Sequence, residues 1–263
     1  MTYKKLGVVG ATGRLGTEVT RALVEEGFEV VPFSRKDTTV AGIPTQRITP
    51  ETSFVGFDVI ISVVGPEGWP DQIPLIARAK ADGVKRFVPS EFGMDHRGEH
   101  VEYLAPKENA LKAAQEAGFA DGWTAFINGF FETVIPSLVQ WDLANETIRI
   151  VGKGTTAYPF IFRHDIGRAI AQTLKAPAAT YKDTWVLIAS GWASGNEIAQ
   201  WVEEAAGKKL SVEHVEPNPK KTPIVSLLET SGRNVFDRSL ATEGLGVQWA
   251  DLKGYVTGLV RGT

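Results

Sequence analysis

The sequence predicts an α/β fold: a Rossmann-type, doubly wound parallel sheet with a smaller C-terminal lobe. Two observations predict it. Short apolar segments alternate with amphipathic helical segments through the first half of the chain, and a glycine-rich turn follows the first apolar segment directly. The alternation becomes less regular from about residue 136. We therefore expect one domain over residues 1–135 and a second lobe mainly over 136–263, with an approximate boundary that the chain can cross more than once.

The individual elements follow from local patterns. The apolar runs 6–9 and 28–33 flank a helical segment over 16–26, which makes a first βαβ unit. The alternation then continues with strands over 58–64, 86–89 and 123–127 and helices over 72–81 and 106–117. In the second half, Asp165 is the expected N-cap of one helix, and Gly207 is expected to end another over 196–206.

Composition excludes several classes of function. The net charge of −3 provides no basic field for a nucleic acid, and the absence of cysteine excludes disulfides, thiolate catalysis and cysteine-ligated metals. No apolar run approaches the ~20 residues of a membrane span, and no targeting segment is apparent. We expect a cytoplasmic protein with no membrane or nucleic-acid partner; the sequence gives no prediction of its oligomeric state.

The glycine-rich turn predicts a dinucleotide site. Gly10, Gly13 and Gly16 lie between the first strand and its helix, where backbone N–H groups and the positive helix end attract a pyrophosphate. The alternative is a tight turn that binds nothing. The expected contacts in this turn are Gly10, Thr12, Gly13, Arg14, Leu15 and Gly16.

The residues after the second strand favour NADP(H) over NAD(H). Ser34, Arg35 and Lys36 occupy the place where an NAD site carries an acidic residue, and a guanidinium suits a 2′-phosphate. The alternative is a solvated loop in which Asp37 pairs with these cations. Val64 and Gly65, at the end of the strand over 58–64, complete the expected cofactor contacts in this part of the chain.

Gln72 and the stretch from Asp82 to Gly93 (DGVKRFVPSEFG) carry a family resemblance. With the glycine turn, they resemble the NmrA-like branch of the atypical short-chain reductases, especially isoflavone reductase and phenylcoumaran benzylic ether reductase relatives. The resemblance covers about the first half of the chain and fades beyond residue 136 to the Asp-Ile-Gly motif at 165–167.

This resemblance implies a catalytic lysine, and Lys107 lies at the matching distance before Gly118. Its ammonium would bind the nicotinamide ribose and polarise or protonate a substrate oxygen. The alternative is a solvated helix lysine. Lys112 lies five positions further along the same helix and so faces elsewhere.

The loop before Lys107 is shorter than in the plant reductases that the chain resembles, which puts the substrate class in doubt. Ser90, Tyr103 and Lys107 also have the Ser…Tyr-x-x-x-Lys spacing of short-chain dehydrogenases, in which the tyrosine donates a proton. Pro106 favours the first helical turn, however, so Tyr103 is expected to precede the helix.

Substrate contacts are expected on two segments: Glu91, Phe92 and His96, and then Asn128, Gly129, Phe130 and Phe131 after the strand over 123–127. His96 and His100 have a metal-ligand spacing only if helical, which Gly98 disfavours, so we expect no metal. We expect His164 to belong to a helix-start hydrogen-bond network and not to act as a base.

Together these features predict an NADPH-dependent reductase of a small, mainly apolar or aromatic substrate, such as a secondary metabolite, with Lys107 assisting proton transfer. Two alternatives stay open. One is a regulatory protein that senses NADP and reports to a protein partner. The other is a non-redox cyclase or isomerase that binds NADP and uses Glu91, His96 or Tyr103.

Overall fold

The computed structural model describes residues 3–97, 102–218, 220, 223–231 and 234–262. The chain forms two compact units. Unit 1 comprises residues 1–127, 163–188 and 242–247, and unit 2 comprises 128–162, 189–241 and 248–263. The sequence predicted one main boundary near residue 135. In the structure the chain first passes from unit 1 to unit 2 after Ile127, and it returns to unit 1 at Arg163.

Unit 1 is built on a parallel sheet in the order β5-β2-β1-β6-β7, in which every neighbouring pair is parallel. A bridge from Phe87 to Trp123 leads on to β8, which pairs with β13 in parallel. The predicted doubly wound α/β fold is therefore confirmed. The strands are β1 (Lys5–Val9), β2 (Glu29–Ser34), β5 (Gln46–Arg47), β6 (Val59–Ser62), β7 (Arg86–Val88), β8 (Thr124–Ile127) and β13 (Thr184–Leu187), beside the small hairpin of β3 (Thr39–Val40) and β4 (Ile43–Pro44).

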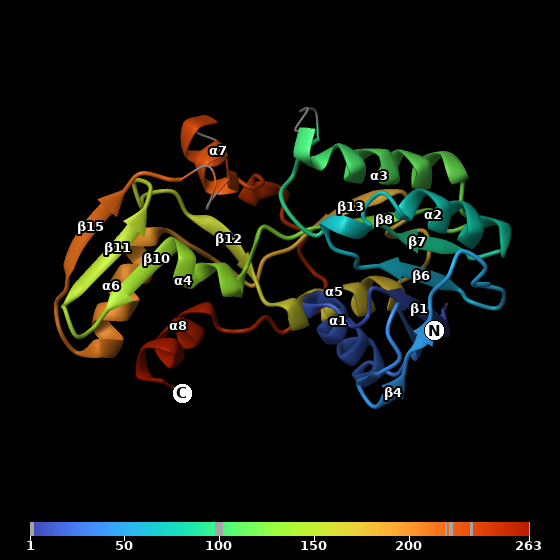
Figure 1. Ribbon diagram of the computed structural model, residues 1–263, viewed down its shortest axis with the longest axis horizontal. Coiled ribbons are helices and arrows are strands. Elements are labelled where there is room, and N and C mark those ends of the chain that lie inside the picture. Colours follow the sequence, from blue (N-terminus) through green and yellow to red (C-terminus); the bar gives the residue numbers. More distant parts are fainter. Residues whose placement is uncertain (1–2, 98–101, 219, 221–222, 232–233, 263) are drawn as a thin grey trace. The chain divides into compact units, whose positions relative to one another are not determined.

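Two helix pairs cover the two faces of this sheet (Figure 1). One pair is α1 (Arg14–Glu25) with α5 (Arg163–Lys175), and the other is α2 (Gln72–Ala81) with α3 (Ala105–Ala117). The first pair packs closely because Gly167 faces Ala22: a Cβ at residue 167 would lie 2.6 Å from the Ala22 Cβ.

The N-cap predicted at Asp165 is wrong. The helix α5 begins at Arg163, so Asp165 lies inside its first turn, with a buried side chain 3.8 Å from Arg168. A carboxylate in the first turn faces the positive end of the helix, which stabilises the helix start without capping it.

Unit 2 contains two three-stranded sheets that the sequence analysis did not resolve. One has the order β10-β11-β15, and the other β14-β12-β9. Their strands are β9 (Phe130–Phe131), β10 (Val139–Asp142), β11 (Thr147–Val151), β12 (Tyr158–Ile161), β14 (Gly191–Ala193) and β15 (Ser211–Val215).

The helices of unit 2 are α4 (Ile135–Leu138), α6 (Gly195–Ala206), α7 (Pro223–Ser231) and α8 (Leu252–Arg261). Ser194 and Glu197 form a capping box at the start of α6, and Gly207 ends it in the left-handed conformation, as predicted. No helix in the described ranges is long and apolar enough to cross a membrane.

Candidate active site

The glycine turn brings backbone groups closer together than any side chain would permit. A Cβ at Gly16 would lie 2.2 Å from the Gly10 carbonyl oxygen, and one at Gly10 would lie 3.1 Å from the Val63 carbonyl. Gly10 also has φ +89°, which glycine adopts without strain. The turn therefore forms a shallow cradle of backbone atoms at the carboxyl end of β1.

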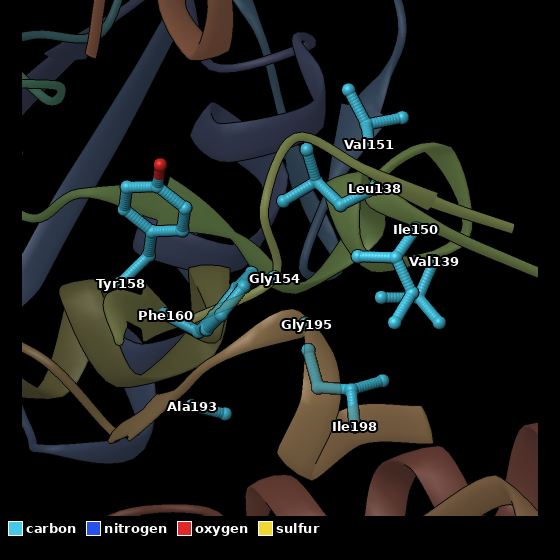
Figure 2. A pocket seen from close by; sticks show the side chains of 10 residues that line it. All are labelled: Leu138, Val139, Ile150, Val151, Gly154, Tyr158, Phe160, Ala193, Gly195 and Ile198. Carbon is cyan, nitrogen blue, oxygen red and sulfur yellow. The ribbon is translucent and has the colours of Figure 1, made fainter. Parts of the chain in front are cut away.

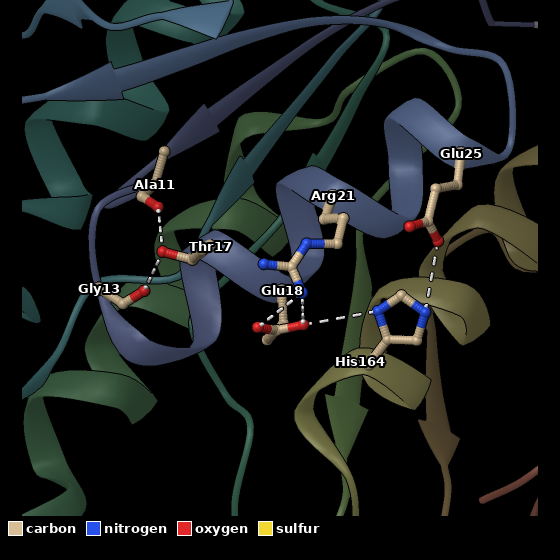
Figure 3. Close-up of polar contacts among 7 residues, drawn as sticks. All are labelled: Ala11, Gly13, Thr17, Glu18, Arg21, Glu25 and His164. Atoms are coloured by element: carbon tan, nitrogen blue, oxygen red, sulfur yellow. Dashed lines mark hydrogen bonds and ion pairs between the residues drawn. The ribbon is translucent and has the colours of Figure 1, made fainter. Parts of the chain in front are cut away.

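The helix α1 begins at this cradle with no side-chain cap on Gly13 and no acidic residue in its first turn. Thr17 braces the turn: its hydroxyl donates to the carbonyls of Gly13 at 3.1 Å and Ala11 at 3.4 Å (Figure 3). The N–H groups of the first turn have no intrahelical acceptor, so they suit an anionic group such as a pyrophosphate. The cradle thus fits the predicted dinucleotide.

The end of β2 lies beside this turn. The Ser34 hydroxyl lies 3.1 Å from that of Thr12 and accepts a hydrogen bond from the Lys36 N–H at 3.0 Å. The side chain of Asp37 lies 3.8 Å from Arg47. In the part of the chain that the structure describes, Arg35 and Lys36 form no ion pair, so both exposed cations are available to a phosphate.

The carboxyl ends of β6 and β7 are tied together near the same edge of the sheet. The Ser90 hydroxyl donates to the Val64 carbonyl at 2.8 Å, and the Ser90 N–H donates to the buried Gln72 side chain at 2.8 Å. Gly65 follows Val64 and is exposed. The Ser90 hydroxyl thus links the segment that follows β7 to the segment that follows β6.

Lys107 is a buried ionisable group of unit 1. It lies in the first turn of α3 and is only 6% exposed. Its Nζ donates to the Glu91 carbonyl and lies 4.7 Å from the centre of the Trp69 ring. Burial lowers the pKa of Lys107 from 10.5 to about 8, while the negative charge of Glu91 acts in the opposite direction. Such a lysine exchanges its proton near neutral pH, as an acid catalyst requires.

A model of the NmrA-like family matches residues 2–238. The chain belongs to the NmrA-like family.

Curated relatives of this NmrA-like protein are named as oxidoreductases, reductases and synthases. It is 30% identical over 241 residues to oxidoreductase aprR of Aspergillus flavus, covering 84% of this chain and 80% of that protein. It is 28% identical over 240 residues to eugenol synthase 2 of Clarkia breweri, covering 78% of this chain and 76% of that protein. A phenylcoumaran benzylic ether reductase of Betula pendula is 27% identical over 241 residues, covering 80% of this chain and 77% of the relative. The resemblance inferred from the sequence is thereby confirmed.

Solved structures share the fold at low sequence identity. The complex of leucoanthocyanidin reductase with NADPH from Vitis vinifera has a TM-score of 0.79 at 19% identity, covering 98% of this chain and 99% of that one. NmrA, a negative transcriptional regulator, has a TM-score of 0.77 at 14% identity, covering 98% of this chain and 96% of that one. Enzymes and a regulator thus share this fold, so the fold alone does not decide the function.

Of the expected catalytic residues, Tyr103 is placed differently from Lys107. It lies in a 3₁₀ turn (Glu102–Leu104) before α3, is 62% exposed, and packs its ring edge-on against Trp69 at 5.4 Å. The structure shows no hydrogen bond between Tyr103 and Lys107 among the described residues. Tyr103 and Lys107, which the Ser…Tyr-x-x-x-Lys spacing had grouped, thus each contact Trp69.

The expected substrate residues fall into two groups. In unit 1, Phe92 stacks on Phe126 in the core at 6.1 Å, whereas Glu91 and His96 form a buried pair with 2.8 Å between the carboxylate and the imidazole. His100 lies outside the described residues.

The second group belongs to unit 2. Asn128 is fully buried and donates to the Gly129 carbonyl at 3.1 Å, and Gly129 has φ +71°. Phe130 packs edge-on against Tyr158 at 5.4 Å, and Phe131 is half-buried. Asn128 and Gly129 thus lead into strand β9, which Phe130 and Phe131 form.

Unit 2 also contains a small pocket that none of these four residues lines. Its walls are apolar side chains and glycines, with the Tyr158 hydroxyl as a polar exception (Figure 2). The lining residues are Leu138, Val139, Ile150, Val151, Gly154, Tyr158, Phe160, Ala193, Gly195 and Ile198.

His164, in the first turn of α5, faces α1. Its two ring nitrogens lie 3.6 Å from Glu18 and 3.4 Å from Glu25, both on α1 (Figure 3). Within the described ranges, no group of three His, Cys, Asp or Glu residues could hold a metal ion.

Sequence reasoning missed the partners of Lys107. No sequence signal marks Trp69 as a neighbour of Lys107, although its ring lies 4.7 Å from the ammonium. The pairing of Glu91 with His96 was also missed, because no sequence spacing marks a contact across an irregular loop. The SEFG motif was the available signal, since it places an acidic residue three positions after a buried strand.

Proposed function

We propose that this protein is an NADPH-dependent reductase of a small, mainly apolar or aromatic molecule, with Lys107 assisting proton transfer. The observation that carries the proposal is the buried Lys107, whose burial lowers its pKa to about 8. An ordinary surface lysine would retain its proton and serve mainly as a fixed charge. The buried ammonium of Lys107, which the Trp69 ring covers, is instead suited to acid catalysis.

The residues of unit 1 fit the cofactor. The glycine cradle and the uncapped start of α1 would bind the pyrophosphate, and Arg35 and Lys36 would bind the 2′-phosphate. NADPH, when bound, supplies a hydride. The chain contributes positioning and a proton: Lys107 would donate from Nζ to an oxygen of the substrate and then be reprotonated from solvent.

Relatives support the choice of substrate class. Several curated relatives are named as reductases or synthases of aromatic plant compounds, and one structural neighbour contains NADP⁺ and pinoresinol.

The direct test is isotope transfer. The protein is incubated with NADPH deuterated at C4 of the nicotinamide, and with either pinoresinol as a probe or a small-molecule extract. Products are searched by mass for deuterium. We expect incorporation with wild type and with Lys112→Met, and at least a hundredfold lower rate with Lys107→Met, about the contribution of one acid catalyst. Lys112 is the matched control because it lies on the same helix with a 72% exposed side chain.

The same experiment separates the alternatives. NADPH binding without deuterium transfer to any molecule would contradict the reductase and favour an NADP sensor. Turnover with oxidised cofactor and no change in its absorbance would favour a non-redox cyclase or isomerase.

Cofactor preference is tested separately. The double variant Arg35→Ala/Lys36→Ala should lose roughly tenfold to a hundredfold in NADPH affinity, because each charge-assisted hydrogen bond contributes about 1.5–3 kcal/mol, part of which solvent screening removes. NADH affinity should stay nearly constant. Arg47→Ala is the control, since Arg47 already pairs with Asp37. Equal losses for both cofactors would refute the assignment of the 2′-phosphate site.

A further inference from the structure

The side chain of Lys107 is enclosed by its neighbours in unit 1. Its Nζ donates to the Glu91 carbonyl, and a Cβ at Gly93 would lie 3.6 Å from the same nitrogen. The Trp69 ring covers a further side, with its centre 4.7 Å from Nζ. Lys107 is only 6% exposed and Trp69 only 8% exposed. The proposed acid therefore has almost no contact with solvent.

This enclosure limits how a substrate can reach the ammonium. Proton transfer requires about 2.6–3.2 Å between the donor and acceptor atoms. Of the three neighbours of Nζ, the Glu91 carbonyl and Gly93 are backbone groups in the segment that follows β7. The third, Trp69, is a side chain, which can turn about its own torsion angles without a backbone movement. The Trp69 side is thus the side from which an oxygen can gain access.

The Trp69 ring is held by a second aromatic ring, which faces solvent. Tyr103 packs edge-on against Trp69 at 5.4 Å and is 62% exposed. Tyr103 lies in the single 3₁₀ turn Glu102–Leu104, and Trp69 directly follows the 3₁₀ turn Pro66–Gly68, with its N–H donating to the Pro66 carbonyl at 3.3 Å. Both rings therefore belong to short turns and not to the strands and helices of the parallel sheet.

We propose that Trp69 is a gating residue that covers the Lys107 ammonium and has to turn away before an oxygen of a ligand can bind to Nζ. The ammonium then exchanges a cation–π contact for a hydrogen bond to that oxygen, so opening brings a compensating gain. The place of the indole suits a planar ring that carries an oxygen, as the nicotinamide or an aromatic substrate would. The inference rests on the proposed function only for the identity of this ligand.

The test measures the access of a reagent to the Lys107 amine. Full-length protein is acetylated with an N-hydroxysuccinimide ester at about pH 9.5, and the rates at Lys107 and Lys112 are compared by mass spectrometry. Cleavage after glutamate places the two lysines on separate peptides, because Glu108 lies between them. Lys112, with a 72% exposed side chain, is the internal reference. In wild type we expect Lys107 to react about tenfold more slowly than Lys112.

Removal of the cover should raise the rate at Lys107. In Trp69→Ala, we expect acetylation of Lys107 relative to Lys112 to increase about tenfold. Burial lowers the pKa of Lys107 to about 8, so at the pH of the assay the wild-type side chain is already mainly a neutral amine. Exposure to solvent would move this pKa back up and slow the reaction, so a faster reaction reports access alone. Trp69→Phe keeps a ring over Nζ and should stay within about threefold of wild type.

Two further variants control for folding and for nonspecific loosening. Tyr103→Ala keeps the inference testable if Trp69→Ala does not fold, since Tyr103 is 62% exposed. Its loss frees the Trp69 ring and should raise the rate at Lys107 about threefold. Trp192→Ala is the matched control, because it removes a tryptophan of unit 2 with an edge-on contact to Phe236 at 5.3 Å. It should leave the rate at Lys107 unchanged.

Three results would overturn the gate. They are an unchanged rate at Lys107 in folded Trp69→Ala, a wild-type rate at Lys107 equal to that at Lys112, and an equal rise in Trp192→Ala and Trp69→Ala. The first result would show that Trp69 does not restrict access. The second would show that nothing does, and the third that the loss of any large ring loosens the protein.

A ligand experiment follows the opening itself. The protein is labelled with 5-fluorotryptophan, and the ¹⁹F resonance of Trp69 is assigned by its loss in Trp69→Phe. NADPH is added alone, and then with pinoresinol. We expect this resonance to shift with whichever ligand protects Lys107 from acetylation, and protection with an unchanged resonance overturns the gate. The failure of the proposed function has a different signature: the variants change access as expected, but no deuterium is transferred from NADPH.

Discussion

Replacing Lys107 by methionine should change how the stability of the protein depends on pH. Methionine has a similar length but no charge, so it removes the titrating group without opening a large cavity. Lys112→Met is the matched control on the same helix, because the side chain of Lys112 is 72% exposed. The comparison isolates the burial of one ammonium.

The magnitude follows from the pKa of Lys107, which burial lowers from 10.5 to about 8. This difference corresponds to about 3 kcal/mol, at ~1.36 kcal/mol per pH unit. In the unfolded chain the lysine regains its ordinary pKa, so the unfolded state binds more protons between these two values. Stability therefore rises with pH in this window: the full cost of the buried charge is present below pH 8 and absent above 10.5.

The assay is urea unfolding at pH values from about 7 to about 10.5, followed by tryptophan fluorescence. We expect the stability of wild type minus that of Lys107→Met to increase by about 3 kcal/mol across this range, whereas wild type minus Lys112→Met stays constant. A wild-type minus Lys107→Met difference that varies by less than ~0.5 kcal/mol would show that Lys107 titrates like a solvated lysine and would refute the reasoning.

Two further predictions concern close backbone approaches. Gly16→Ala should weaken NADPH binding more than tenfold and lower stability by ~1–3 kcal/mol, since its Cβ would lie 2.2 Å from the Gly10 carbonyl oxygen. Gly65→Ala, with no atom within 4 Å of the added Cβ, should be nearly neutral in stability. Gly167→Ala should lower the thermal midpoint by several degrees through its 2.6 Å contact with Ala22, as measured by calorimetry, while leaving NADPH affinity within about twofold.

Much of unit 1 could be predicted because its signals are local. Apolar runs flanked by turns gave the strands on both sides of the glycine turn, and helical periodicity placed α2 at residues 72–81, the observed bounds. Lys107 was singled out only through the resemblance to the NmrA-like reductases, which implies a lysine on the helix that Gly118 ends in the left-handed conformation. The residues that determine these strands and helices lie close to each other in the chain.

Tertiary structure decided what surrounds those residues. Strand β13 joins β8 across nearly sixty residues of sequence, and the strands of unit 2 are only two to five residues long, too short for a periodic pattern to identify them. The environment of Lys107 likewise depends on contacts from η1 (Pro66–Gly68), which Trp69 follows, and from the loop after β7. The sequence by itself determined the glycine turn and, through the family resemblance, singled out Lys107. Only folding determined that this lysine is desolvated and paired, because burial and charge are sums over neighbours distant in the chain.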